Sequence, residues 1–304
     1  MSTKIKKVPS QKCRYCDDTY IVIEAMSGAY AQAALCSCFP VPCGVCHGAR
    51  FKLEQDSQGR DIAMPCPECE VRKRNIKLYN NARVPNNYAP SKLPRSDRDK
   101  ENQRVYNLLT TIVRNYAKNK KSTPSPTEIR RQTIDSKGLV LMGSPGTGKT
   151  YLMAGFAYQC TINLGVSCMF QGFSELLSEI KNGFSSQKSE MEIIAPHLAA
   201  ELLIIDDLGK GRNTEWELSV LDTLISQRYN SNKPIMVTSN YTERESTTIK
   251  ERLLTKDKTG EDKFTADTLR RRVGERIYSR LREMCYFETL TGRDRRLEGS
   301  EVDY

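Results

Sequence analysis

The sequence Gly143-Ser144-Pro145-Gly146-Thr147-Gly148-Lys149-Thr150 is a complete G-x-x-x-x-G-K-[ST] motif. It follows the apolar run 138–142, which has the length and composition of a buried strand, and it precedes the helix-forming stretch 151–157. This order predicts a phosphate-binding loop, because backbone N–H groups that turn inward leave no room for Cβ atoms. The alternative is a glycine turn with a chance lysine, and the flanking strand and helix argue against it.

All eight residues of the loop are candidate nucleotide ligands, which predicts ATP and Mg²⁺ as cofactors. We expect Lys149 to reach the β- and γ-phosphates and Thr150 to offer its hydroxyl to Mg²⁺. The positive end of the helix that follows adds a favourable field for anions.

Two carboxylates end a second aliphatic run, Leu202-Leu203-Ile204-Ile205-Asp206-Asp207. Such a run is typical of a central parallel strand, whose carboxyl end carries ligands. We expect Asp206 to hold Mg²⁺, directly or through water, and Asp207 to orient and deprotonate the attacking water. The alternative is an ordinary acidic turn after a strand.

Further strands and helices complete an α/β pattern. A strand over 234–239 ends at Asn240, whose amide can bond the γ-phosphate and the water without adding charge. A strand over 167–170 precedes a helix over 173–180, residues 242–266 are expected as a loop, and the arginine-rich stretch 270–281 as one helix. The sequence therefore predicts a parallel sheet flanked by helices.

Positive charge is concentrated in the N-terminal half of the chain. The 304 residues carry a formal charge of +10, and residues 1–137 hold 25 Lys and Arg against 13 Asp and Glu, while residues 138–304 hold 22 against 24. This bias is compatible with nucleic acid or an acidic protein face. No stretch approaches about 18 consecutive apolar residues, and the first residues lack a signal-peptide core, so we expect a soluble cytoplasmic protein with no membrane partner.

Eight of the eleven cysteines lie in residues 13–69 as four close pairs, which predicts two closed zinc sites. The simplest grouping takes neighbouring pairs together: Cys13, Cys16, Cys36 and Cys38 around one Zn²⁺, and Cys43, Cys46, Cys66 and Cys69 around the second. Interleaved ligation, disulfides, and His47 as a replacement ligand are the alternatives. The other three cysteines stand in apolar company and are expected to be packing residues.

Domain boundaries follow from these motifs. Residues 1–79 are expected as a zinc-binding domain that binds a partner, residues 80–100 as a proline-rich linker, and residues 101–304 as the ATPase domain, beginning with a helix over 101–118. Because two separate cores are expected, metal removal should leave nucleotide binding largely intact.

The motifs together resemble the DnaC/IstB-like AAA+ ATPases, the family that contains bacterial and phage replicative helicase loaders of the DnaC and DnaI kind. The resemblance rests on the glycine loop, on Leu-Leu-Ile-Ile-Asp-Asp-Leu-Gly-Lys, on Trp216-Glu217 with Gln227-Arg228-Tyr229, on Thr238-Ser239-Asn240, and on Arg276-Ile-Tyr-Ser-Arg280-Leu281. The first cysteine block is similar to the zinc segment with which DnaI-like loaders hold the helicase. The second block has no counterpart that we place in the family.

The resemblance implies an ATP-dependent helicase loader that binds a DnaB-like hexamer and single-stranded DNA and self-associates through its ATPase interfaces, encoded by a bacterium, a phage or a mobile element. It makes Arg280 the arginine finger that completes a neighbouring subunit's site, with Arg276 as the alternative, and Arg296 a nucleotide contact within its own subunit. Asp207 stands where many AAA+ motors carry glutamate, which indicates a slow switch. The alternatives are an IstB-like helper of a transposase, and a binding module whose loop only closes around nucleotide.

We expect single-stranded DNA to bind the segment 181–188, which is predicted as a loop after the second helix. Its two lysines, Lys181 and Lys188, would track phosphates, and Phe184 would stack on a base. The alternative is that Phe184 packs beneath the helix and that the lysines are solvated.

Overall fold

A five-stranded parallel sheet forms the centre of the protein. The structure is a computed structural model, and it describes residues 13, 16, 20–36, 43, 45–89, 100–119, 137–243 and 268–295. The spatial strand order is β6-β7-β8-β5-β9, and all neighbouring pairs are parallel. The strands are β5 (Gly138–Met142), β6 (Cys168–Gly172), β7 (Leu202–Asp206), β8 (Ile235–Ser239) and β9 (Cys285–Thr289).

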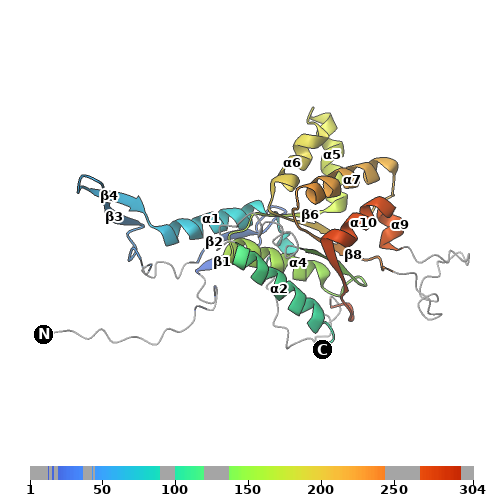
Figure 1. The fold of residues 1–304 in the computed structure, drawn as a ribbon, viewed down its shortest axis with the longest axis horizontal. Coiled ribbons are helices and arrows are strands. Elements are labelled where there is room, and N and C mark those ends of the chain that lie inside the picture. Colours follow the sequence, from blue (N-terminus) through green and yellow to red (C-terminus); the bar gives the residue numbers. More distant parts are fainter. Residues whose placement is uncertain are drawn as a thin grey trace, which may run out of the picture.

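Alternating residues of each central strand enter two different cores, as the strand period of two requires. Leu139 and Leu141 pack with α2 (Gln103–Asn119) and α4 (Lys149–Tyr158), whereas Val140 and Met142 pack with α5 (Phe173–Ser185) and α7 (Glu215–Asn230). Figure 1 shows these two helix layers on opposite sides of the sheet. The predicted α/β fold with a parallel sheet flanked by helices is confirmed.

The other helices in the described part of this half are α6 (Glu190–Ala199), α9 (Leu269–Val273) and α10 (Glu275–Met284). A π-helical turn, η3 (Gln159–Asn163), continues α4. The single helix expected over 270–281 is wrong, because Gly274, with a φ of 81°, separates α9 from α10. Helix α5 also extends to Ser185, so most of the expected loop 181–188 is helical. Cys160, Cys168 and Cys285 are buried in the two cores, as predicted.

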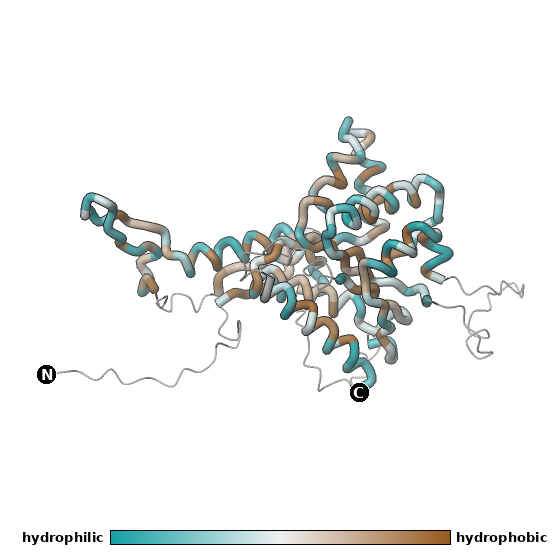
Figure 2. Tube along the Cα trace, in the orientation of Figure 1, coloured by the Kyte–Doolittle hydropathy of each residue, from teal (hydrophilic) through white to brown (hydrophobic). Residues whose placement is uncertain are grey.

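The described residues of the N-terminal part form two antiparallel hairpins and a long helix. Strands β1 (Ile21–Glu24) and β2 (Gln32–Leu35) pair, as do β3 (Phe51–Gln55) and β4 (Asp61–Pro65). Helix α1 (Pro67–Asn81) leads from the second hairpin to the sheet, followed by η1 (Asn86–Tyr88). In Figure 1 the β3–β4 hairpin stands at the far end of α1, away from the sheet, and Figure 2 shows apolar and polar residues mixed along it.

The part of the expected linker that the structure describes, 80–89, is packed against the sheet. Val84 and Ala89 are buried in the same core as Leu139, and Phe170 N–H donates a hydrogen bond of 2.7 Å to the carbonyl oxygen of Ala82. Ile21 and Tyr79 belong to that core as well. The β1–β2 hairpin and the end of α1 therefore share a core with the sheet, whereas Cys43, Cys46, Cys66 and Cys69 form a separate cluster. The division into a zinc-binding and an ATPase domain stays a prediction.

None of the helices in the described ranges combines the length and the apolar character that a membrane span requires.

Candidate nucleotide site and metal centres

The glycine loop joins β5 to α4, as predicted. Gly148, with a φ of 100°, precedes the first residue of α4, Lys149, which is 5% exposed. Lys149 Nζ donates hydrogen bonds of 2.8 Å to the carbonyl oxygens of Gly143 and Ser144, and Thr147 Oγ1 donates one of 2.9 Å to that of Ser144. These bonds hold the ammonium group at the loop, where phosphate oxygens can replace the carbonyls as acceptors.

Asp206 lies beside the loop, at the carboxyl end of β7. Thr150 Oγ1 is 3.0 and 3.2 Å from its two carboxylate oxygens, and Thr238 Oγ1 donates a bond of 2.5 Å to Asp206 Oδ1. The pKa of Asp206 is raised above its ordinary value, mainly because the carboxyl group is buried. The charge of Asp207 raises the pKa as well, and the hydrogen bond from Thr238 partly offsets this shift. A carboxylate and a hydroxyl side by side are ligands that Mg²⁺ prefers, so the residues present fit this ion.

Thr238 is a positioning residue that the sequence did not single out for a role. Its strand, β8, lies between β7 and the loop strand β5. Its side chain is fully buried, donates to Asp206 and accepts a hydrogen bond of 2.9 Å from the Asp207 N–H. A hydroxyl can do both at once, whereas valine in the same space could do neither.

Asp207 occupies a left-handed backbone conformation, with a φ of 56°, which non-glycine residues adopt rarely. Its Oδ1 accepts from Asn240 Nδ2 at 3.2 Å, and its Oδ2 is 3.3 Å from Lys210 Nζ. The structure therefore brings the predicted base and the predicted sensor amide into contact. The backbone turn re-aims the second carboxylate away from the direction that an ordinary strand would give it.

The two candidate finger arginines lie on α10 and differ in exposure. Arg280 Nη1 donates to Asp222 Oδ1 at 2.7 Å and to Ser226 Oγ at 2.6 Å, and its side chain is 21% exposed. Arg276 Nε is 3.6 Å from the same carboxylate, and its side chain is 73% exposed. Asp222 thus ties both guanidinium groups to α7 within one chain.

The chain beyond β9 runs along the glycine loop. Arg295 N–H donates a hydrogen bond of 3.0 Å to the carbonyl oxygen of Gly146, and the Asp294 carboxyl packs against the same glycine. The nucleotide contact that the family resemblance implies, Arg296, lies outside the described residues. The sequence did not predict the contacts of Asp294 and Arg295 with the glycine loop, because a short charged segment has no hydrophobic periodicity.

A protein-family comparison covers the centre of this site. Residues 131–256 match the family described as IstB-like ATP binding protein. The matched residues include the glycine loop, Asp206, Asp207 and Asn240. This segment of the chain is therefore similar to the IstB-like ATP binding proteins.

The curated relatives match this chain over only part of their own lengths. The phage-like element PBSX protein XkdC of Bacillus subtilis is 31% identical over 109 residues, 34% of this chain and 40% of that protein. The replicative helicase loader DnaC of Escherichia coli K12 is 26% identical over 144 residues, 46% of this chain and 58% of that protein. The crystal structure of a DnaC helicase loader aligns with a TM-score of 0.47 at 22% identity, over 67% of this chain and 99% of that one.

The second cysteine cluster lies outside the matched IstB/DnaC segment, at the start of α1. The sulfur atoms of Cys43, Cys46, Cys66 and Cys69 lie within 4.8 Å of one another, and all four residues are buried. The pairs Cys43–Cys66 and Cys46–Cys69 have Sγ···Sγ distances of 3.7 Å. A zinc tetrahedron with Zn–S of about 2.3 Å has edges of about 3.8 Å, so the four thiols fit Zn²⁺.

The first cluster brings together Cys13, Cys16 and Cys36, with Cys13 Sγ 3.8 Å from Cys36 Sγ. The fourth predicted ligand, Cys38, lies outside the described residues. These distances are nearly twice a disulfide length of about 2.0 Å, and the cysteines in both clusters are free thiols, so the disulfide alternative is wrong. The clusters follow the neighbouring-pair grouping, and His47 is exposed and belongs to neither of them.

The predicted DNA-binding residues lie around the end of α5. Phe184 is 56% exposed, so the alternative that it packs beneath the helix is wrong. Lys181 Nζ lies 5.0 Å from the centre of the Trp216 ring, and Lys188 lines a cavity of about 430 Å³ with Arg83 and Glu179. Lys181 and Phe184 thus lie in the last two turns of α5, and Lys188 lies three residues past its end.

Proposed function

We propose that this protein is an ATP-dependent loader of a replicative DNA helicase, in which ATP hydrolysis acts as a slow switch. The observation that carries the proposal is the contact between Thr150 of the glycine loop and Asp206, with Asp207 and Asn240 next to it. The similarity to the replicative helicase loader DnaC of Escherichia coli supports DNA replication as the process. The chain spans about two fifths to three fifths of the relatives it matches, so the loader role is carried over as a proposal.

In this proposal each residue has one task. Lys149 and the loop N–H groups bind the phosphates, and Thr150 and Asp206 would hold Mg²⁺, which supplies positive charge to the phosphate oxygens. Asp207 accepts a proton from the attacking water, and Asn240 keeps its carboxylate in place. Aspartate is one methylene shorter than glutamate, which favours slow hydrolysis.

Zinc would be structural in both clusters, since four thiolates close the coordination sphere. The region that contains the two cysteine clusters would bind the helicase. Helix α1 holds the β3–β4 hairpin of this region away from the sheet (Figure 1). Phe184, Lys181 and Lys188 would bind single-stranded DNA, and self-association would place an arginine of α10 at a neighbour's site.

ATP turnover is the first test of this function. The wild-type chain should hydrolyse ATP slowly, and Lys149→Ala should abolish binding. Asp207→Asn should bind ATP and not hydrolyse it. Equal turnover in Lys149→Ala and wild type would sink the proposal.

The partner is tested by co-purification with a hexameric replicative helicase and, in parallel, with a transposase. Retention of the helicase supports the loader. The family description, IstB-like ATP binding protein, keeps the transposase helper as the second candidate, and retention of the transposase alone would establish it.

The DNA surface is tested with a matched aromatic and lysine pair on the other edge of the sheet. Phe184→Ala, and Lys181→Ala with Lys188→Ala, should each weaken ATP-dependent binding to single strands, with a lost stacked base costing about 1–3 kcal/mol. Tyr286, 43% exposed with Lys137 Nζ 5.6 Å from its ring centre, provides the control variant Tyr286→Ala. Equal losses in the control and the Phe184 variant would contradict the assignment.

A further inference from the structure

Residues 290–295, here called the strap, lie directly on the glycine loop. Leu290 N–H donates a hydrogen bond of 2.7 Å to the Met142 carbonyl oxygen at the end of β5, and Arg295 N–H donates to Gly146. A methyl group added at Gly143 would overlap the Leu290 carbonyl, and one added at Gly146 would overlap the Asp294 carboxyl group. Two of the loop glycines therefore give the strap its close approach, in addition to any role toward phosphate.

The strap brings two opposite charges to the loop. The Asp294 carboxyl group packs on Gly146, and the Arg295 side chain lies beside Gly148, where an added methyl group would be 3.7 Å from its Cδ. Both glycines belong to the turn whose N–H groups and lysine make it suitable for anions. A carboxylate in direct contact with this turn runs against the chemistry of the site.

The position of Asp294 is fixed from both sides. Arg295, the next residue, is bonded to Gly146, and Thr291, three residues earlier, is held by the buried side chain of Asn102. The backbone at residue 294 is therefore held beside the loop. Like charges a few ångströms apart in a partly buried site repel strongly, and the repulsion grows with each added phosphate charge.

We propose that Asp294 is a negative determinant of nucleotide affinity, whose charge opposes ATP more than ADP and ADP more than AMP. The inference rests on the proposed binding of nucleotide at this loop, and it identifies a residue that weakens this binding. The built-in repulsion makes release of nucleotide easy, which suits a switch that must reset.

The test replaces the charge while keeping the shape of the side chain. Asp294→Asn should bind ATP about 10-fold and ADP about 3-fold more tightly than wild type, with AMP nearly unchanged, at low ionic strength. The ratio of variant to wild-type affinity for ATP should shrink toward one at about 0.5 M salt, because mobile ions screen the repulsion. Equilibrium titration with each nucleotide gives these values, and thermal unfolding verifies that both chains are folded.

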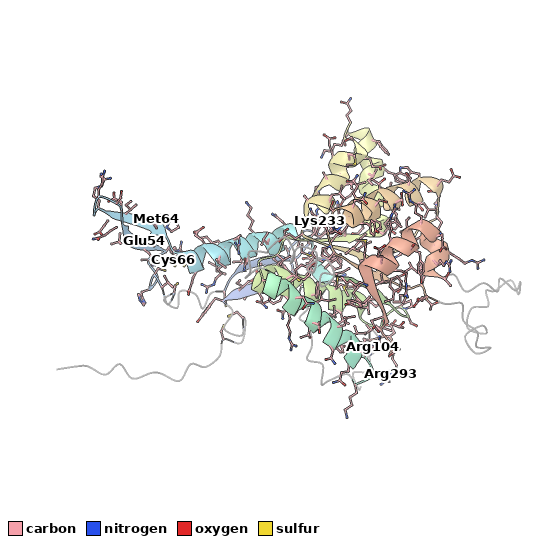
Figure 3. All side chains as sticks on the ribbon, viewed as in Figure 1. Glu54, Met64, Cys66, Arg104, Lys233 and Arg293 are labelled. Carbon is pink, nitrogen blue, oxygen red and sulfur yellow. The ribbon has the colours of Figure 1, made fainter. Side chains whose placement is uncertain are left out.

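Two further variants complete the experiment. Asp294→Glu keeps the charge and should stay close to wild type for all three nucleotides. Glu54→Gln removes one negative charge from the β3–β4 hairpin and should change none of the affinities, because Figure 3 shows Glu54 far from Arg293 of the strap.

If Asp294→Asn raises the affinity for AMP, ADP and ATP equally, Asp294 acts through strap packing and the inference is overturned. If Asp294→Asn raises none of the three affinities, the charge has no effect and the inference is overturned as well. Both outcomes leave the proposed function standing. A folded wild-type chain that binds none of the three nucleotides overturns the proposed function, and the inference with it.

Discussion

Asn102, one residue ahead of α2, holds Thr291, two residues past β9, through three hydrogen bonds that join positions 189 residues apart. Asn102 Nδ2 donates to the Thr291 carbonyl oxygen at 2.9 Å, and Asn102 Oδ1 accepts from the Thr291 N–H at 2.8 Å and from its hydroxyl at 3.1 Å. The amide side chain thus pairs with a backbone residue as a neighbouring strand would. It fixes the start of the strap beside the nucleotide site.

Asn102→Ala should lower the free energy of unfolding by about 1–3 kcal/mol, since a buried amide with three bonds is lost. Urea denaturation measures this change. Asn107→Ala, at an exposed position of α2, is the control and should be nearly neutral. An Asn102 variant as stable as this control would show that the three bonds are replaced by water without cost.

Substitution of Arg228 should strongly destabilise the fold. It is 1% exposed, and its guanidinium donates to the carbonyl oxygens of His197, Ala200, Glu201 and Pro234. Burial lowers the pKa of Arg228 to about 10, so it is charged at neutral pH. Arg228→Met leaves four carbonyls without their donor and should cost about 3–5 kcal/mol.

The control for Arg228 is Arg212→Met at an exposed position, which should change stability by less than about 0.5 kcal/mol. Chemical denaturation of both variants decides the point. Two variants with similar midpoints would contradict the structural role assigned to the four carbonyl bonds.

Metal removal should affect the ATPase core through α1. Cys66 and Cys69 lie at the start of this helix, while Asn75 Nδ2 donates to the Ile162 carbonyl oxygen at 2.8 Å and Tyr79 is buried against Tyr158. Cys66→Ser should therefore lower zinc content from two to one per chain and also lower the melting temperature of the whole protein. The control is Cys168→Ser, which changes a buried thiol outside both clusters and should leave zinc content unchanged.

Zinc content by elemental analysis and melting by circular dichroism test this coupling. A Cys66 variant that loses one metal but melts like wild type would indicate two independent cores.

Acid should destabilise the fold through His197. Burial lowers the pKa of this histidine, which contacts Gln171 and the Ile193 carbonyl and lies near Arg83 and Glu179. The unfolded chain then binds a proton at a pH where the folded chain does not, so stability is full above about pH 6.5 and falls as the pH drops below it. His197→Gln should remove this component, and His47→Gln, at the exposed second histidine, should keep it. Identical pH profiles for the two variants would contradict the assignment.

The sequence predicted the parts of the fold in which local pattern and tertiary role agree. The aliphatic runs of β5, β7 and β8 are buried on both faces, and the predicted loop, carboxylates and Asn240 meet at their carboxyl ends. Strand β9 was missed because Cys285-Tyr-Phe-Glu-Thr lies at the sheet edge, only partly buried, and carries no aliphatic run. The break at Gly274 was missed because Val273, Ile277 and Leu281 keep helical spacing across it.

Contacts between segments that are distant in the sequence could not be predicted from local sequence patterns. The strap on the glycine loop, the Asn102–Thr291 bonds and the packing of 80–89 on β6 join distant segments through single side chains or backbone groups. The left-handed conformation of Asp207 was also hidden, since aspartate rarely adopts it and only the surrounding bonds enforce it.

Variants of Asp222, which contacts both arginines of α10, can distinguish the roles of Arg276 and Arg280. Arg280→Ala removes an ion pair to α7 as well as any contact to a neighbouring subunit, so a loss of hydrolysis alone does not identify a finger. Asp222→Asn removes the same ion pair and leaves the guanidinium in place. If Arg280 completes a neighbour's site, Arg280→Ala should bind ATP and hydrolyse it poorly, while Asp222→Asn retains turnover.

Mixing experiments then assign the finger. Arg280→Ala mixed with Asp207→Asn should recover part of the activity, because some interfaces combine an intact arginine with an intact carboxylate. Arg276→Ala should keep turnover in this case and need no rescue. The opposite pattern, with loss and rescue in Arg276→Ala and equal effects of Arg280→Ala and Asp222→Asn, would make the exposed Arg276 the finger and leave Arg280 as the residue that holds α10 on α7.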